Sequence, residues 1–355
     1  MDHKAAEGGM SPDSGHGVVE HASSAARQER IALFDNIKGL LIVLVVFGHV
    51  AHPVHNSNPA LSTAFDIIYL FHMPLFVFMS GLFAKGAYRD SKLNCNRIIS
   101  FLALGFAFQL ALALINGATL TPRRICAFTS APWYLISMAC WYAATPLLLR
   151  LGILRGMALS LAIALLWGMV DLSSGFLAIS RTMTFLPCFA LGYYLPPQSV
   201  VRLRERKGLW IAVGASALIV VARLLNHDAY AWFFPMVYGD NPYEHGLLVG
   251  MAQKLTALAA GGVLSLSVLK LVPTRSSWLT TLGQRTLQVY VLHRLIRAWL
   301  TFHTPLYDAA WMNDPIFGTA AVMALTAAIT ALCSLPQLER PFARILSFRW
   351  FRNSR

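Results

Sequence analysis

Three ionisable side chains lie within one long apolar run near the N-terminus. Asp35, Lys38 and His49 all fall in the run near residues 33–53. With about 100° and 1.5 Å per residue in a helix, Lys38 and His49 project within roughly 20° of each other, and Asp35 lies roughly 40° from His49. Ionisable groups inside a membrane helix are costly, so they are candidates for a functional site by default.

These three groups have complementary chemistry. A neutral histidine is the usual base for a hydroxyl near neutral pH, so His49 is a candidate general base. Lys38 could bind an anionic or polarised carbonyl group, and Asp35, three residues earlier, could hold the ammonium charged and oriented. A lysine that snorkels to the interface and a histidine that packs near the outer surface explain the same pattern equally well.

The second apolar run carries a histidine beside a proline. His72 lies near its middle, and Pro74 follows two residues later. A proline frees a backbone carbonyl and should kink the helix, which membrane proteins tolerate mainly where a cavity or a neighbour compensates. His72 is therefore a candidate for a second polar wall of the site, although it could also simply hydrogen-bond another helix.

The ninth apolar run holds a polar stripe at helical spacing. Its members fall within a sector of roughly 100°. They are Tyr290, His293, Arg294 and Arg297. Such a stripe is disfavoured against lipid, so it should face the bundle interior or a water-filled cavity, although the outermost Arg297 could snorkel.

The elements that must position these groups are membrane helices. Of the 355 residues, 56% are hydrophobic and only 13% are charged, whereas soluble domains average about 25% charged. Ten apolar runs are candidates for spanning roughly 30 Å of hydrocarbon. They lie near 33–53, 61–84, 98–117, 132–149, 152–170, 182–196, 208–226, 246–271, 279–302 and 315–336. We therefore expect an all-α, polytopic helical bundle of about ten transmembrane helices in a lipid bilayer.

The distribution of basic residues predicts the orientation of this bundle. With the N-terminus in the cytoplasm, the inner segments hold most of the Lys and Arg residues, whereas the outer segments hold only Arg123, Arg124 and Arg181. By the positive-inside rule both termini are then cytoplasmic. The net charge of +13 is dispersed over the inner loops and forms no single patch with interleaved aromatics, so no nucleic-acid partner is expected.

The chain divides into a membrane domain and two tails. Residues 1–30 are polar and Gly/Ser-rich and lack the apolar core of a signal peptide, which predicts a disordered cytoplasmic tail. Residues 31–338 form the transmembrane domain, and 339–355 form a basic cytoplasmic tail. The five cysteines include no CxxC pair, so neither a disulfide framework nor a metal site is expected.

The longest outer connection, near 227–245, is acidic and aromatic and has no Lys or Arg. It could cap an acceptor site that faces outward. An ordinary loop with an interfacial belt of aromatic side chains would have the same composition.

Six segments, in order along the chain, resemble those of one family. They are FDNIKG with GH (34–39, 48–49), FHMPLFVFMSG (71–81), PWYL (132–135), FLPCFALGY (185–193), LG with YVLH (282–283, 290–293) and ERP (339–341). Together they resemble the acyltransferase-3 family of bacterial integral membrane O-acyltransferases, particularly its fucose 4-O-acetylase-like subgroup.

The resemblance implies a ten-helical fold in the bacterial cytoplasmic (inner) membrane. It also implies transfer of an acyl group, often acetyl from acetyl-CoA, to a hydroxyl of a cell-surface or exported carbohydrate. The family's pattern of a basic residue, ten intervening residues and a histidine falls on Lys38 and His49. Many members have Arg at the first position, and a lysine cannot reproduce the bidentate geometry of a guanidinium.

On this resemblance, acetyl-CoA would dock at the cytoplasmic face with its phosphates near four basic residues. They are Lys85, Arg89, Lys92 and Arg97. The acyl arm would pass Lys38, Asp35 would orient or tune this part of the site, and His49 would deprotonate the acceptor hydroxyl. The polar stripe of the ninth run would contact the acceptor. An acyl-histidine intermediate is the competing mechanism.

Two other classes of protein share these features. A transporter or flippase could use the intramembrane Asp, Lys and His groups as a relay. A membrane sensor or assembly subunit could keep the fold without turnover. The identity of the acceptor sugar, the choice between acetyl and succinyl, and the oligomeric state are open at this point.

Overall fold

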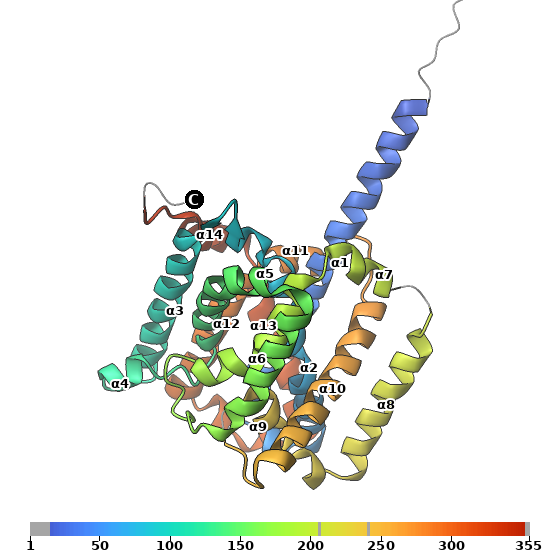
Figure 1. Ribbon diagram of the computed structural model, residues 1–355. Helices are drawn as coiled ribbons and strands as arrows, with labels where there is room; N and C mark the ends of the chain where they lie inside the picture. Colours follow the sequence, from blue (N-terminus) through green and yellow to red (C-terminus); the bar gives the residue numbers. More distant parts are fainter. Residues whose placement is uncertain (1–14, 205–206, 240–241, 352–355) are drawn as a thin grey trace, which may run out of the picture.

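The computed structural model describes residues 15–204, 207–239 and 242–351, and it is nearly all helical. The helices are α1 (Gly15–Ala51), α2 (Pro59–Leu82), α3 (Cys95–Ile115), α4 (Pro122–Ile125), α5 (Trp133–Leu166), α6 (Ile179–Tyr194), α7 (Pro197–Leu203), α8 (Leu209–Leu225), α9 (Phe233–Tyr238), α10 (Leu247–Leu271), α11 (Trp278–Gln284), α12 (Thr286–His303), α13 (Phe317–Cys333) and α14 (Glu339–Ser347). The strands β1 (Tyr88–Arg89) and β2 (Lys92–Leu93) form an antiparallel hairpin. Figure 1 shows the arrangement.

Helices occupy all ten of the predicted apolar runs, with two differences in how they are divided. The fourth and fifth runs share α5, which bends at Gly152 (φ 70°, ψ 175°), and the ninth run is split between α11 and α12. Within the described residues, five helices are long and apolar enough to cross a membrane, and the bent pair α13–α14 adds a sixth if it is one span. The nearly all-α prediction is confirmed, and the number of about ten crossings stays a prediction.

The beginning of α1 and helix α14 lie at the same end of the bundle (Figure 1). An even number of crossings would give this arrangement, and the location of that end in the cytoplasm stays a prediction. The sequence predicts disorder over residues 1–30, but α1 begins at Gly15. Alanine, glutamate and arginine are common between residues 20 and 30, and their helix propensity is high, which explains why the helix extends beyond the apolar segment. Residues 1–14 lie outside the described part.

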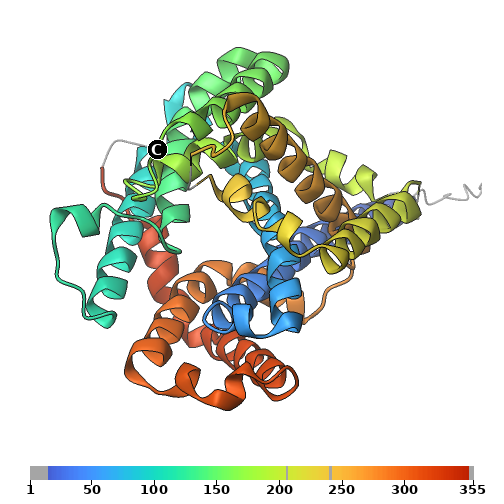
Figure 2. The same ribbon diagram turned by 90° about the horizontal axis from the view of Figure 1, so that it is seen from below.

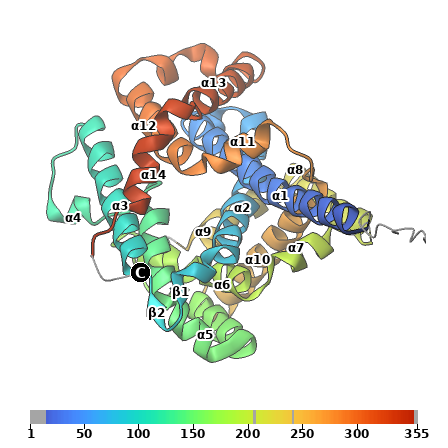
Figure 3. The same cartoon turned by 90° about the horizontal axis from the view of Figure 1, so that it is seen from above.

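The predicted C-terminal tail is partly a helix that packs on the bundle. The hydroxyl of Ser100, in α3, donates to the backbone oxygen of Ile345 at 2.9 Å, and Arg97 Nη1 donates to that of Leu346 at 3.1 Å. These bonds hold α14 across the end of α3, where Figure 3 shows the two helices side by side.

Helix α1 is joined to α11 by a buried amide. Asn36 has no exposed surface, and its Nδ2 donates to the backbone oxygens of Pro273 and Arg275 at 2.8 Å each. Its Oδ1 accepts from the hydroxyls of Ser277 and Thr280. Because every polar atom of this side chain is bonded, its burial is compensated and the register of α1 on α11 is specified.

Gly39→Ala should lower the stability of the bundle by about 1–3 kcal/mol. A Cβ at Gly39 would lie 2.1 Å from the backbone oxygen of Leu279, so α1 and α11 would have to separate. Thermal unfolding in detergent, followed by tryptophan fluorescence, measures the effect. Gly214→Ala in α8 is the matched control, because a Cβ there meets nothing within 4 Å. Equal transition temperatures for the two variants would contradict the prediction.

Helix α2 lies between two groups of helices, with α1 on one side and α6 and α10 on the other (Figures 2 and 3). It extends from Pro59 to Leu82 and includes Pro74, where the sequence predicts a kink. A Cβ at Gly261 of α10 would lie 2.5 Å from the backbone oxygen of Leu70, the carbonyl that Pro74 leaves without a helical donor. The close packing of α10 therefore covers this carbonyl. A neighbouring helix thus compensates for the proline, which is one of the two possibilities that the sequence predicts.

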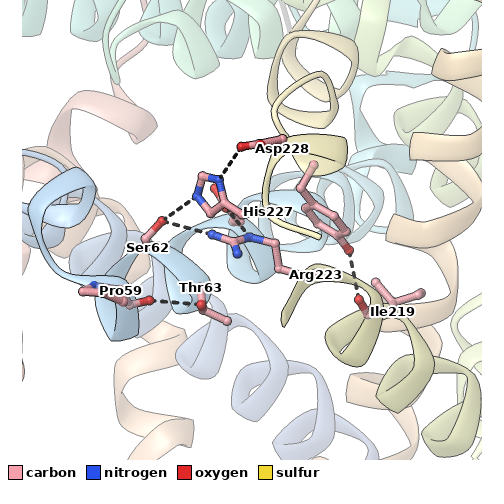
Figure 4. Close-up of polar contacts among 9 residues, drawn as sticks. Pro59, Ser62, Thr63, Ile219, Arg223, His227 and Asp228 are labelled. Atoms are coloured by element: carbon pink, nitrogen blue, oxygen red, sulfur yellow. Dashed lines mark hydrogen bonds and ion pairs between the residues drawn. The ribbon is translucent and has the colours of Figure 1, made fainter. Parts of the chain in front are cut away.

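An ion pair between a buried arginine and a half-buried aspartate attaches α8 to α2 at the end of the bundle opposite α14. Arg223 is 3% exposed, and its Nε lies 2.6 Å from Asp66 Oδ2 while its Nη2 donates to Ser62 Oγ at 3.1 Å. Figure 4 shows Arg223 and His227 converging on Ser62, with His227 Nε2 3.3 Å from Ser62 Oγ. Removing Asp66 would leave the buried guanidinium of Arg223 without its carboxylate, so this cluster fixes where the connection after α8 begins.

Candidate active site

A cavity of about 250 Å³ lies where the C-terminal end of α1 meets α2, α6, α9 and α12. Its wall includes five of the polar residues that the sequence singles out. They are His49, His72, Tyr290, Arg294 and Arg297. We call this space the histidine cavity. The stripe on α12 is buried as predicted, since none of its four side chains is more than 9% exposed.

The histidines of α1 and α12 form a hydrogen-bonded pair at this cavity. His293 Nε2 lies 3.1 Å from His49 Nδ1, and the ring centroids are 5.1 Å apart. His49 Nδ1 also lies 2.9 Å from the backbone oxygen of Val45, and His293 Nδ1 lies 2.7 Å from that of Val289. The sequence placed the two histidines in separate roles, whereas the fold brings them into contact.

These contacts assign the ring protons of the neutral histidines. A carbonyl oxygen only accepts hydrogen bonds, so Nδ1 carries the proton in both His49 and His293. His293 Nε2 therefore has a lone pair, which accepts the His49 Nδ1–H that is shared with Val45. The remaining nitrogen of His49, Nε2, is unprotonated on a side chain that lines the cavity. That is the form a general base requires.

His293→Ala should lower the turnover of a reaction that uses His49 as its base about 10²-fold, because His49 would lose one of the two acceptors of its Nδ1–H and with it part of the stabilisation of its protonated form. His293→Gln should recover most of this loss, since an amide oxygen can accept the same proton. The measurement is kcat of both variants at saturating substrate. A purely structural role for His293 would give no such rescue. Equal losses of kcat in the two variants would contradict the assignment of His293 as the acceptor of the His49 Nδ1–H.

His72, the sequence candidate for a second polar wall of the site, lines the histidine cavity. It is 2% exposed, and its Nδ1 lies 2.7 Å from the backbone oxygen of Ile68. By the same argument its Nε2 is an acceptor, and the hydroxyl of Tyr238 lies 3.5 Å from it. His72 therefore presents an acceptor to the cavity from the side facing α9.

Two arginines of α12 place positive charge beside the histidine pair. Arg297 Nε donates to the backbone oxygen of His49 at 3.1 Å, and Arg294 Nε donates to Ser130 Oγ at 3.2 Å. The Nη1 atom of Arg294 is buried and has no hydrogen-bond partner among the described residues. A buried N–H without a partner is costly, which makes this atom the natural donor to an oxygen of a bound substrate.

A second cavity, of about 320 Å³, opens towards α14. Lys38, Arg97, Gln284 and Leu346 are in its wall, and we call it the lysine cavity. Lys38 Nζ lies 2.7 Å from Asp35 Oδ1, and Gln284 Nε2 donates to Asp35 Oδ2 at 3.3 Å. The predicted pairing of Asp35 with Lys38 is therefore present. Lys38 and His49 lie on one face of α1, but they line different cavities.

The predicted phosphate-binding residues divide into two groups. Arg97 is half-buried in the lysine cavity, whereas Lys85, Arg89 and Lys92 are exposed on or beside the β1–β2 hairpin. Arg89 and Lys92 line a separate surface pocket of about 370 Å³, and Arg89 lies 3.7 Å from Asp90. The hairpin lies at the same end of the bundle as α14, as Figures 1 and 3 show together.

The histidine cavity also contains residues that sequence reasoning did not assign to it. Phe234 and Tyr238 come from α9, inside the connection that the sequence allowed as a cap for an acceptor site. Arg181, counted only as an outer-loop charge, lines the cavity with its guanidinium 5.5 Å from the ring centre of Trp133 and 5.6 Å from that of Tyr238. Within the described residues, no group of three or more His, Cys, Asp or Glu side chains could hold a metal ion.

Similarity to known proteins extends over nearly the whole bundle. The family model described as an acyltransferase domain, Acyl_transf_3, matches residues 31–335. The chain belongs to the acyltransferase-3 family. This family is membrane-embedded, which agrees with the five long apolar helices and identifies the chain as a membrane protein.

Relatives of this acyltransferase-3 member match over shorter stretches. Nodulation protein NolL of Sinorhizobium fredii is 47% identical over 72 residues, which are 19% of this chain and 20% of that protein. Nodulation protein NolL of Mesorhizobium japonicum is 42% identical over 66 residues, 18% of each chain. The chain thus spans about a fifth of the length of the curated relatives it matches. No solved structure matches it.

Proposed function

We propose that the chain is a membrane O-acyltransferase, which moves an acetyl group from acetyl-CoA to a hydroxyl of a cell-surface or exported carbohydrate. The observation that carries this proposal is the pair of cavities along one face of α1. One contains Lys38 and Arg97, and the other contains His49 with a free Nε2 lone pair. We place the protein in the bacterial cytoplasmic membrane, with the lysine cavity facing the cytoplasm.

The lysine cavity suits the donor. Lys38 and Arg97 supply positive charge to an anionic group or a polarised carbonyl, and the half-buried Arg97 is the closest of the four basic candidates to the interior. The exposed Lys85, Arg89 and Lys92 would hold the phosphates of the nucleotide at the hairpin. Asp35 keeps the Lys38 ammonium in place through their 2.7 Å contact. A lysine here acts as a point charge, in contrast to the arginine of many relatives.

The histidine cavity suits the acceptor. His49 Nε2 would take the proton of the carbohydrate hydroxyl, and the resulting oxygen nucleophile would attack the thioester carbon. Negative charge then develops on the carbonyl oxygen, and the free Nη1–H of Arg294 would stabilise it. When the C–S bond breaks, His49 returns its proton to the sulfur of CoA, which leaves an ester and free CoA. No metal takes part in this sequence of steps.

The test uses inside-out membrane vesicles from cells that produce the protein, supplied with acetyl-CoA carrying a labelled acetyl group. We expect label in the glycan fraction and a mass increase of one acetyl group per modified sugar, with neither in vesicles that lack the protein. A transporter or flippase would move glycan without consuming acetyl-CoA. Vesicles that release no CoA and label no glycan would contradict the proposal.

A further inference from the structure

The two cavities meet at one aromatic side chain. Tyr290 is in the wall of the histidine cavity and also in the wall of the lysine cavity. No other described residue is in both walls. Neighbouring residues divide between the two sides: in α2, Met73 lines the histidine cavity and Phe76 lines the lysine cavity. Tyr290 therefore stands between the space containing Lys38 and the space containing His49.

Tyr290 is at one end of a row of three aromatic side chains. Its ring centroid lies 5.5 Å from that of Tyr134, which lies 5.5 Å from that of Phe76, and both pairs are edge to face. We call these three residues the septum. None of them is more than 9% exposed. Such aromatic pairs attract each other beyond their buried area, which stabilises the present position of the Tyr290 ring.

Each tyrosine of the septum is also held by its hydroxyl. Tyr290 donates to the backbone oxygen of Ala131, just before α5. The hydroxyl of Tyr134 lies 2.5 Å from Ser80 Oγ in α2. The bond to Ala131 ties α12 to the beginning of α5. The Tyr290 ring also lies 5.9 Å from that of Phe108 and 6.3 Å from that of His293, so rotating it would break one hydrogen bond and change three ring contacts.

In the proposed reaction, the acyl end of a donor in the lysine cavity must reach an acceptor in the histidine cavity. The thioester carbon must come within about 3–3.5 Å of the acceptor oxygen that His49 deprotonates. A donor whose acyl end enters from the lysine cavity reaches that position only when the Tyr290 ring moves aside. The space opened by one ring is small, so each extra methylene on the acyl group should be strongly disfavoured.

We propose that Tyr290 is the gate between the donor and acceptor cavities, and that it determines the acyl size that the enzyme accepts. This inference rests on the proposed acyltransferase function. When closed, Tyr290 also separates the thioester from water in the histidine cavity. Its role is thus to admit a short acyl group and to limit hydrolysis of the donor while no acceptor is bound.

The experiment measures acyl transfer to glycan and hydrolysis without acceptor, using acetyl-CoA, butyryl-CoA and octanoyl-CoA with the full-length protein in membranes. Tyr290→Ala should raise the ratio of butyryl to acetyl transfer at least about tenfold, since one methylene in a tight pocket changes rates by about that factor or more. It should also raise hydrolysis of acetyl-CoA. Tyr290→Phe keeps the ring and should keep the size selection, with faster hydrolysis because the bond to Ala131 is lost.

Tyr142→Ala is the matched control. Tyr142 lines the lysine cavity against Phe101, with ring centroids 5.2 Å apart, and is not part of the septum. It should leave the butyryl to acetyl ratio unchanged, whereas an equal rise would show that cavity volume, and not the gate, sets acyl size. If wild-type protein transfers acetyl and Tyr290→Ala keeps its selectivity, the gate is wrong and the function stands. If wild-type protein neither transfers nor hydrolyses any of the three donors, the function itself is wrong.

Discussion

His49→Ala should lower acetyl transfer by about 10³-fold while the affinity for acetyl-CoA changes little. A positioned general base contributes about 10² to 10⁴ to a rate. His49 Nε2 is unprotonated at the cavity, whereas the Nε2 of His72 lies 3.5 Å from the hydroxyl of Tyr238. The donor site of the proposal lies at Lys38 and Arg97, in the other cavity, so its binding is independent of the base. Turnover and acetyl-CoA binding, measured on the same preparation, separate the two effects.

The matched control is another histidine of the same protein. His303 is exposed at the end of α12, where its Nε2 lies 2.7 Å from the backbone oxygen of Ile115, outside both cavities. His303→Ala should retain wild-type turnover. A His49→Ala protein that folds normally and turns over at the wild-type rate would exclude the base. Acid quenching followed by mass spectrometry decides between direct transfer and an acyl-histidine, because only the latter leaves an acetyl group on His49.

Local patterns in the sequence predicted which polar side chains share one face of a helix. The 3.6-residue period places Lys38 and His49 on one face of α1, and it places the polar residues of α12 towards the interior, where the structure buries them. The cost of exposing charge to lipid makes such patterns reliable in apolar helices. The same logic identified the Asp35–Lys38 pair, whose members are three residues apart.

Contacts between distant segments could not be predicted in this way. His49 and His293 are separated by 244 residues, and nothing in the period of either helix says which residue of α12 meets which residue of α1. The division into two cavities has the same origin, because it depends on where Tyr290 meets Tyr134 from another helix. The sequence left open whether the segment that forms α9 contributes to the site. An aromatic connection between helices can line a site or lie at the membrane interface, and its composition is the same in both cases.

Arg294→Ala should lower kcat by about 10² to 10³ with a smaller change in KM, the loss expected when one donor to a developing oxyanion is removed. Arg294 Nε is occupied by Ser130 Oγ, which orients the guanidinium, and the buried Nη1 has no partner among the described residues. Its hydrogen bond is therefore available when charge appears in the transition state. Steady-state kinetics with acetyl-CoA, at saturating acceptor, give kcat and KM separately.

Two further variants distinguish a directed hydrogen bond from general positive charge. Arg294→Lys keeps the positive charge. A single ammonium cannot reproduce the fixed geometry by which a guanidinium bonds both Ser130 and a substrate oxygen. Most of the loss in kcat should therefore persist in Arg294→Lys. Arg181→Ala removes a positive charge from the same cavity, where that guanidinium lies over the rings of Trp133 and Tyr238. It should raise KM for the acceptor more than it lowers kcat. Equal losses of kcat in Arg181→Ala and Arg294→Ala would mean that the summed charge of the cavity, rather than the Arg294 N–H, stabilises the transition state.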